Sequence, residues 1–253
     1  MSFAYERLRD PSYFQENRLP AHSDHQIYAT RSEWEANDSS LRFSLNGLWK
    51  FHHALNEQQV ISGFEALEYD CHPWREIHVP AHIQMEGYGV PQYANKQYPW
   101  DGSEDIKPGQ LPDNFNPVAC YVKYFRLPES MKGKRVFISF QGAESCVAVW
   151  LNGRYVGFSS DSFSPADFEL TPYLCDGENK LACRVYRFCS GSWLEDQDFF
   201  RFSGLFREVY LYAAPSVHLE DLKLQPELDD DYCNANLSIG MKLMTEEIGR
   251  AHV

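Results

Sequence analysis

The sequence has 253 residues, 43% of them hydrophobic, so the chain is long enough to bury a substantial core. Its formal net charge of −13 at pH 7 argues against nucleic acid or an anionic membrane surface as a partner, because both would repel it. The N-terminus has no uninterrupted apolar run, and no stretch approaches the roughly 20 apolar residues that cross a bilayer, so we expect a cytoplasmic protein.

The first forty residues differ from the rest of the chain. Residues 1–40 carry two prolines and scattered aromatic residues but show no strand alternation. Ordering such an extended arm by itself would cost much conformational entropy, so we expect the arm to pack on another domain or on another subunit.

Residues 41–215 are predicted to form many short strands separated by turn residues. Apolar residues alternate in 135–142, and the dipeptide Asn152-Gly153 lies between two β-rich runs. Asn-Gly supplies the two positive φ angles of a type I′ hairpin turn, and Asn46-Gly47 is predicted to form a second one. The pattern predicts an all-β fold, most simply a jelly-roll β-sandwich.

A second β pattern begins after Pro215. Residues 216–247 contain two or three strand signals, too few to close a sandwich of about 100 residues, so a truncated domain is expected. The last six residues, IGRAHV (248–253), can be back-translated into a sequence that resembles the start of a widely used sequencing adapter. We therefore predict that 248–253 is a non-native tail.

The seven cysteines lie far apart and form no C-x-x-C pair. The odd number and the spacing predict reduced, mostly buried thiols rather than a disulfide framework or a zinc site. Cys120, Cys146 and Cys183 lie inside apolar strand-like runs, where cysteine behaves as a small hydrophobic residue.

A cluster of three carboxylates, Glu195, Asp196 and Asp198, lies among aromatic residues. Aromatic faces cover the C–H surface of a sugar and charged oxygens bind its hydroxyl groups, so the cluster predicts a site for a sugar or a cation. The alternative is a loop whose acids pair with its own arginines, Arg201 and Arg207.

Six motifs follow one another along the chain: ENRLPAH (16–22), SLNGLWKF (44–51), VPAHIQMEGYGVPQYANKQYPW (79–100), NPVACYVKYF (116–125), WLNGRYVGFSSDSFSPADFELTPYL (150–174) and GSWLEDQDFFRFSGLFREV (191–209). Taken together and in this order, they closely resemble the N-terminal portion of the bacterial β-galactosidases of glycoside hydrolase family 2. The resemblance implies a jelly-roll, galactose-binding-like domain at 41–215 and the start of an immunoglobulin-like sandwich at 216–247. In the family a (β/α)₈ barrel follows and hydrolyses terminal β-D-galactosides such as lactose with retention.

The resemblance implies that no catalytic residue lies in this chain. Retaining hydrolysis needs two carboxyl groups about 5–5.5 Å apart, and in the family both come from the barrel. The family's acid/base glutamate follows an asparagine, but the only such dipeptide here, Asn56-Glu57, lies in the wrong domain. The clustered acids near Glu195 are expected to stay ionised beside the arginines. We expect an inactive part of a β-galactosidase. One alternative is a stand-alone carbohydrate-binding module. A third possibility is the large subunit of a two-chain enzyme, although such a subunit would be expected to include the barrel.

Two substrate-binding residues follow from the resemblance. Asp198 matches an aspartate that reaches into the barrel's active site and binds a sodium ion and galactosyl hydroxyls, and Asn95 matches an asparagine that contacts the galactose ring. The alternatives are a turn-forming role for Asn95 and an ion pair with arginine for Asp198. We assign Glu195 and Asp196 to structure, and we expect Trp193, Phe199 and Phe200 to be buried by packing rather than to wall a sugar site.

A magnesium site known in some relatives is not expected near the arm. Ser190 and Ser160 stand where those relatives have an acid and a glutamine, and the amide oxygen of Asn17 cannot hold magnesium alone. Magnesium is expected only in the full-length enzyme. The arm resembles a segment that supports subunit assembly, so the full-length protein is expected to be a homo-oligomer.

Overall fold

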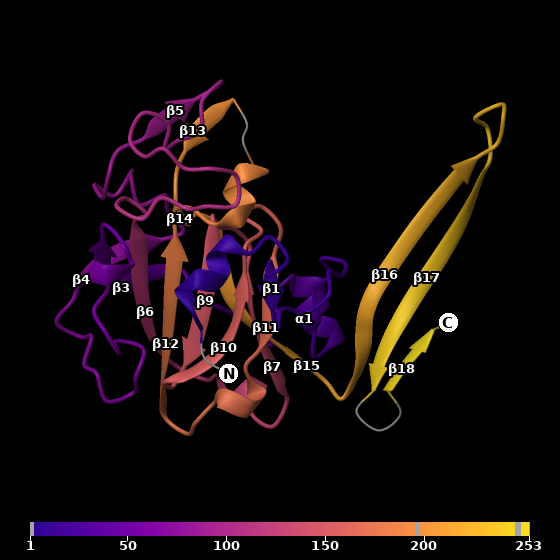
Figure 1. Cartoon of the computed structure of the whole chain (residues 1–253). Helices are drawn as coiled ribbons and strands as arrows, with labels where there is room; N and C mark the ends of the chain where they lie inside the picture. Colours follow the sequence, from indigo (N-terminus) through magenta and orange to yellow (C-terminus); the bar gives the residue numbers. More distant parts are fainter. Residues whose placement is uncertain (1–2, 196–197, 246–248, 253) are drawn as a thin grey trace.

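The computed structural model describes residues 3–195, 198–245 and 249–252, and β-strands dominate it (Figure 1). A seven-stranded sheet has the order β1-β10-β9-β12-β6-β3-β4, and a four-stranded sheet has the order β11-β7-β15-β2. Buried side chains from both sheets form one hydrophobic core, so the two sheets pack as a sandwich. This confirms the predicted all-β sandwich.

The elements have the following bounds. The seven-stranded sheet contains β1 (Gln15–Glu16), β3 (Gly47–Ala54), β4 (Arg75–Val79), β6 (Val118–Arg126), β9 (Cys146–Leu151), β10 (Arg154–Ser159) and β12 (Glu178–Tyr186). The four-stranded sheet contains β2 (Arg42–Ser44), β7 (Arg135–Phe140), β11 (Ala166–Glu169) and β15 (Val209–Ala214). Two short pairs are β5 (Gln92–Ala94) with β13 (Phe199–Arg201) and β8 (Ala143–Glu144) with β14 (Gly204–Leu205). The helical elements are η1 (Tyr5–Arg9), α1 (Arg31–Ala36), η2 (Glu57–Gln59), η3 (Glu129–Met131), η4 (Thr171–Tyr173) and η5 (Ser190–Trp193).

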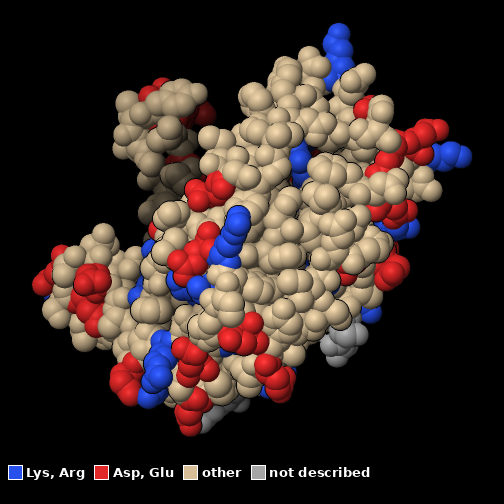
Figure 2. All heavy atoms as spheres, turned by 90° about the vertical axis from the view of Figure 1, so that its left-hand side faces the viewer, with Lys and Arg blue, Asp and Glu red and all other residues tan. Residues whose placement is uncertain are grey.

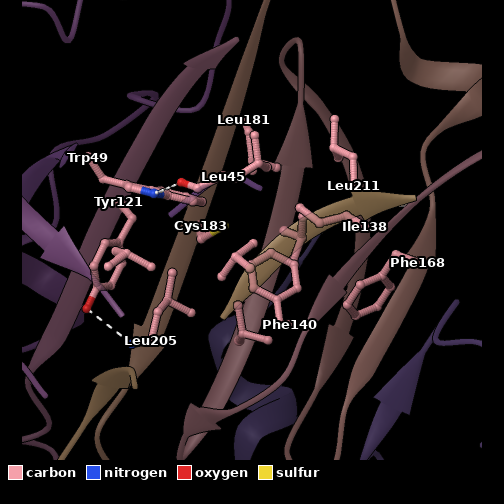
Figure 3. Packing of buried hydrophobic residues seen from close by; sticks show 14 of the residues in the cluster. Leu45, Trp49, Tyr121, Ile138, Phe140, Phe168, Leu181, Cys183, Leu205 and Leu211 are labelled. Atoms are coloured by element: carbon pink, nitrogen blue, oxygen red, sulfur yellow. Dashed lines mark hydrogen bonds between the residues drawn. The ribbon is translucent and has the colours of Figure 1, made fainter. Parts of the chain in front are cut away.

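The central strand β12 is buried on both faces. Leu181 and Cys183 point into the core between the sheets, where they meet Ile138 of β7 (Figure 3). Ala182 and Tyr186 belong to a second buried cluster on the other face of the same sheet. Because both faces are buried, small and apolar residues occupy both sides of β12, interrupted by Lys180 and Arg184.

One of the two predicted hairpin turns is confirmed and the other is wrong. Asn152 and Gly153 have φ angles of 52° and 77° and connect β9 to β10, as a type I′ turn requires. The Asn46-Gly47 dipeptide instead carries the chain from the four-stranded sheet to the seven-stranded sheet. Of the two residues only Gly47 has a positive φ, and the Asn46 side chain accepts a hydrogen bond from the Val209 amide.

The N-terminal arm packs on the outer face of the seven-stranded sheet, which confirms that it is ordered by contact with another part of the protein. Leu8 is fully buried, the Tyr13 ring stacks on Phe158 with centroids 5.0 Å apart, and β1 pairs with β10. The carboxylate of Glu16 accepts hydrogen bonds from the hydroxyl groups of Tyr13 and Tyr155 and so fixes the arm on β10.

The prediction that most of the cysteines are buried is confirmed. Five of the seven lie in the interior, whereas Cys175 and Cys233 are exposed. None of the helices in the parts of the chain that the structure describes combines the length and the apolar character needed to cross a membrane. On the face shown in Figure 2, many charged side chains lie along the lower edge and the right-hand margin, and a further group of acidic and basic side chains lies just left of the middle.

A three-stranded unit follows the sandwich and projects away from it (Figure 1). It consists of β16 (Val217–Leu228), β17 (Ala235–Thr245) and β18 (Gly249–His252). The arm links the sandwich to this unit, because the Ser23 amide donates to Asp221 Oδ1 over 2.8 Å and the ring of His25 bonds to the Leu219 carbonyl over 2.9 Å. The immunoglobulin-like assignment and the adapter-derived tail remain predictions.

Candidate functional site

The two predicted ligand-binding residues lie opposite each other at one end of the sandwich. In the short β5–β13 pair, at the top of Figure 1, Phe199 lies opposite Ala94 and Phe200 lies opposite Tyr93. Continuing this antiparallel register by one residue places Asp198 opposite Asn95. The pairing therefore brings together residues that are far apart in the sequence.

The pleat of the two strands sets which side chains share a face. Side chains two residues apart on a strand point to the same side, and directly opposed residues do so as well. Tyr93 and Asn95 of one segment therefore share a face with Asp198 and Phe200 of the other. Sequence reasoning singled out Asn95 and Asp198 but missed Tyr93, although its spacing of two residues from Asn95 is a usable signal.

Tyr93 is the hydrogen-bond partner of Asp198. Its hydroxyl group donates to Asp198 Oδ1 over 2.6 Å, and both residues are exposed. This hydrogen bond is the main cause that raises the pKa of Tyr93, because the carboxylate favours the protonated phenol. Tyr93 thus stays a donor at neutral pH and orients the carboxylate, while the amide of Asn95 adds a donor and an acceptor beside it.

The aromatic residues near the acidic cluster divide into packed and exposed ones. Trp193 packs with centroids 4.5 Å from Tyr98 and 4.6 Å from Trp100, so it joins the segment after β5 to the segment before β13. Phe199 is half-buried, whereas Phe200 is 51% exposed. The expectation that all three aromatic residues are buried is therefore wrong for Phe200, because its side chain points to the open face of this small sheet.

Glu195 has the structural role expected of it. Its Oε2 accepts a hydrogen bond from the Ser162 hydroxyl over 2.7 Å, and the Arg201 guanidinium donates to its backbone oxygen. Burial raises the pKa of Glu195, because desolvation outweighs the hydrogen bonds from Ser162 and the attraction of Arg201. Asp196 lies outside the described residues.

Glu144 is a buried acid that the sequence did not single out. It lies in β8 and is 7% exposed, and its Oε2 lies 3.8 Å from His82 Nδ1. Burial, reinforced by the neighbouring Glu195 carboxylate, raises the pKa of Glu144 to about 7. Arg201 and Arg187 act in the opposite direction but do not restore the usual value.

The substitution Glu144→Gln should change how stability depends on pH. A raised pKa in the folded state means that the stabilisation is complete below pH 4.5, the ordinary pKa, and is lost as the pH rises through about 7. Between pH 4.5 and 8 we expect the free energy of unfolding of the native protein to fall by about 3 kcal/mol relative to Glu144→Gln. Denaturant unfolding at a series of pH values measures this difference.

Glu35→Gln is the matched control, because the Glu35 side chain is 57% exposed in a surface pair with Arg31. It should leave the pH dependence of the native protein unchanged. Parallel stability curves for the native protein and Glu144→Gln would contradict the assignment.

The residues at the position of the relatives' magnesium site bond to the protein itself. Asn17 Nδ2 donates to the Val156 carbonyl over 2.7 Å, and the Ser160 hydroxyl donates to the carbonyl of Phe14. Within residues 3–195 and 198–245, no group of three or more His, Cys, Asp or Glu side chains is placed to hold a metal ion. A cation at Asp198 would therefore need ligands from outside this part of the chain.

Comparison with known proteins gives a consistent set of matches. Residues 42–215 match the family described as "Glycosyl hydrolases family 2, sugar binding domain". A "Beta-galactosidase" of Halalkalibacterium halodurans is 51% identical over 245 residues, which cover 96% of this chain and 24% of that protein. A "Beta-galactosidase" of Streptococcus thermophilus is 48% identical over 235 residues, 93% of this chain and 23% of that protein. The chain thus spans about a quarter of the length of these curated relatives.

Solved structures agree in fold. A beta-glycosidase from Bacteroides vulgatus superimposes with a TM-score of 0.60 at 25% identity and covers 81% of this chain and 24% of that one. A beta-glucuronidase from an uncultured Clostridium sp. superimposes with a TM-score of 0.58 at 21% identity, over 89% of this chain and 36% of that one. The second likeness concerns the fold alone.

Proposed function

This chain belongs to glycosyl hydrolase family 2, and from that premise we propose that it is the N-terminal part of a β-galactosidase, which hydrolyses terminal β-D-galactosides of the lactose type with retention. One observation supports the proposal most strongly. The register of the β5–β13 pair, continued by one residue, brings the exposed Asn95 opposite the exposed Asp198, although the two residues are far apart in the sequence. This arrangement fits the polar wall of a sugar site.

In the proposed site Asp198 and Asn95 bind the galactosyl hydroxyl groups. An ionised carboxylate accepts hydrogen bonds from hydroxyl groups, and a carboxamide can both donate and accept. The hydrogen bond from Tyr93 holds one carboxylate oxygen of Asp198, which leaves the other oxygen to be directed at the ligand. The roles of these residues are binding and orientation; no proton is transferred in this chain.

The oxygen atoms of Asp198 and Asn95 could supply part of the coordination shell of a sodium ion. Asp198 offers carboxylate oxygens and Asn95 an amide oxygen, and hard cations prefer oxygen ligands. One carboxylate and one amide fill only part of a cation's coordination shell, so the barrel would supply the remaining ligands. When bound, the cation would neutralise Asp198 and offer a positive charge to the sugar oxygens.

The catalytic carboxyl pair is proposed to lie outside this chain. Glu144 and Glu195 have raised pKa values, but Glu144 is buried, and the half-buried Glu195 accepts hydrogen bonds from the hydroxyl and amide groups of Ser162. Hydrolysis by this chain alone is therefore not expected. The acid and the nucleophile would both come from the barrel.

The substitution Asp198→Asn tests the proposed binding role. In the protein extended to the length of its relatives, we expect Asp198→Asn to lower kcat/KM for a β-galactoside by about 10- to 100-fold and to weaken the dependence on sodium. The fold should persist, because the amide oxygen of asparagine can still accept the hydrogen bond from Tyr93. Initial rates over a series of sodium concentrations measure both effects.

Asp176→Asn is the control, because Asp176 is an exposed aspartate in the turn before β12. It should keep the native rate and the native sodium response. An unchanged sodium response in Asp198→Asn would remove the support for this residue as a ligand.

A further inference from the structure

A continuous row of aromatic rings starts beside Asp198 and runs along the same end of the sandwich. Phe200 lies 5.6 Å from Tyr93 and 5.8 Å from Phe202, measured between ring centroids. Phe202 stacks on His82 at 4.5 Å, and His82 stacks on Phe206 at 5.0 Å with an angle of 9° between the ring planes. We call these five residues the aromatic row.

The aromatic row is accessible at its polar end and supported at its other end. Tyr93 and Phe200 are 56% and 51% exposed, whereas Phe202 and Phe206 are half-buried. His82, in the middle of the row, lies with its Nδ1 3.8 Å from the buried carboxylate of Glu144. The two exposed rings are therefore supported by the less exposed rings next to them, so they lose little entropy when a ligand binds.

Strand geometry fixes the direction of the row relative to the proposed galactose site. Asp198, Phe200 and Phe202 are spaced two residues apart, so their side chains point to the same face in succession. If the hydroxyl groups of a galactosyl ring bond to Asp198, the ring attached to it would thus lie against the faces of Tyr93 and Phe200. Aromatic faces bind the C–H surface of sugars and the faces of other rings.

We propose, on the basis of the proposed function, that the aromatic row is the subsite for the ring-bearing aglycone of the galactoside, with Phe200 as the residue that determines this specificity. The galactosyl group is held by Asn95 and Asp198, and the aglycone ring, aromatic or sugar, lies against Phe200 and Tyr93. The row then favours galactosides with a ring next to the glycosidic oxygen over those with a small alkyl group.

Saturation-transfer difference NMR on this chain tests the proposal, since the method detects weak complexes. The ligands are phenyl β-D-galactoside, methyl β-D-galactoside and lactose. We expect strong transfer to the phenyl protons and to the glucose protons of lactose, and little transfer to the methyl group. Phe200→Ala should reduce the transfer to the aglycone by about fivefold or more, and Phe200→Tyr should retain it.

Phe14→Ala is the matched control, because Phe14 is 54% exposed on the arm and outside the aromatic row. It should show the native transfer. Equal aglycone transfer in Phe200→Ala and in the native chain, or no transfer in the native chain, would overturn the proposal.

Phenyl β-D-glucoside separates this inference from the proposed function. If the glucoside and the galactoside give the same phenyl signal, and Phe200→Ala abolishes both, the aromatic row binds aglycones but the galactose selectivity of Asn95 and Asp198 fails. If the galactoside alone binds and Phe200→Ala leaves its phenyl signal intact, the galactose site stands and the aglycone subsite fails.

Discussion

Replacing Lys180 by methionine is expected to lower the free energy of unfolding by about 3–5 kcal/mol. Lys180 is 1% exposed on the central strand β12. Its Nζ donates to the backbone oxygens of Phe64, Ala66 and Tyr69 over 2.7, 2.7 and 2.5 Å. Methionine keeps the length of the side chain but removes the donor, so three carbonyl groups of the loop over the outer face of the sheet lose a common partner.

Denaturant unfolding of Lys180→Met and of the native chain measures this loss. Lys134→Met is the control, because Lys134 also donates to one backbone oxygen, that of Ser130 over 2.9 Å, but is only half-buried. Its effect should stay below about 1 kcal/mol. If both substitutions lowered the free energy of unfolding equally, burial of the lysine and the number of backbone oxygens that it binds would not determine the effect.

Replacing Arg184 by methionine should destabilise the fold by a similar amount, about 3–5 kcal/mol. Arg184 lies between the half-buried Glu57 and the buried Glu65: its Nη1 is 2.8 Å from Glu57 Oε1, and it forms a closer ion pair with Glu65. The Tyr186 hydroxyl donates to the other oxygen of Glu57 over 2.9 Å. Burial already raises the pKa of Glu57, and loss of the guanidinium would leave a buried and a half-buried acid without their cation.

Neutralising the acids should restore stability. The triple variant Arg184→Met, Glu57→Gln, Glu65→Gln is expected to recover most of the loss seen in Arg184→Met, because the uncompensated charges are then absent. Arg31→Met serves as the control, since Arg31 pairs with Glu35 at an 84% exposed position and should change stability by less than about 0.5 kcal/mol. A triple variant as unstable as the single one would refute the charge explanation.

The contacts of Asn56 and Glu57 give the Asn-Glu dipeptide a structural role. The side chain of Asn56 accepts a hydrogen bond from the Gln59 amide and begins η2, and Glu57 reaches to Arg184. Both residues of the dipeptide therefore have local roles in the loop that covers the seven-stranded sheet. Their sequence, taken alone, could not distinguish this arrangement from a catalytic one.

Local patterns predicted the strands and the turn at Asn152-Gly153, because alternation and turn chemistry act over a few residues. The same turn prediction failed at Asn46-Gly47. There the Asn46 side chain accepts a hydrogen bond from the Val209 amide, and the chain crosses from one sheet to the other instead of forming a hairpin. Pairing over long distances in the sequence is not visible in either pattern.

In the candidate site, too, local sequence patterns predict one part and long-range pairing determines the rest. The resemblance to a family pointed to Asn95 and Asp198, but neither periodicity nor composition could place them on paired strands. The hydrogen bond between Tyr93 and Asp198 and the exposure of Phe200 depend on the β5–β13 register. The raised pKa of Glu144 depends on its burial beneath β13, which no local signal in the sequence reveals.

The most direct test of the proposed function is the hydrolysis of a chromogenic β-galactoside by this 253-residue chain, beside residues 1–247 extended with the downstream coding sequence of the gene. We expect only the extended protein to release the chromophore, since the barrel that it gains is proposed to supply both catalytic carboxyl groups. Hydrolysis by the 253-residue chain alone, or no hydrolysis by the extended protein, would contradict the proposal.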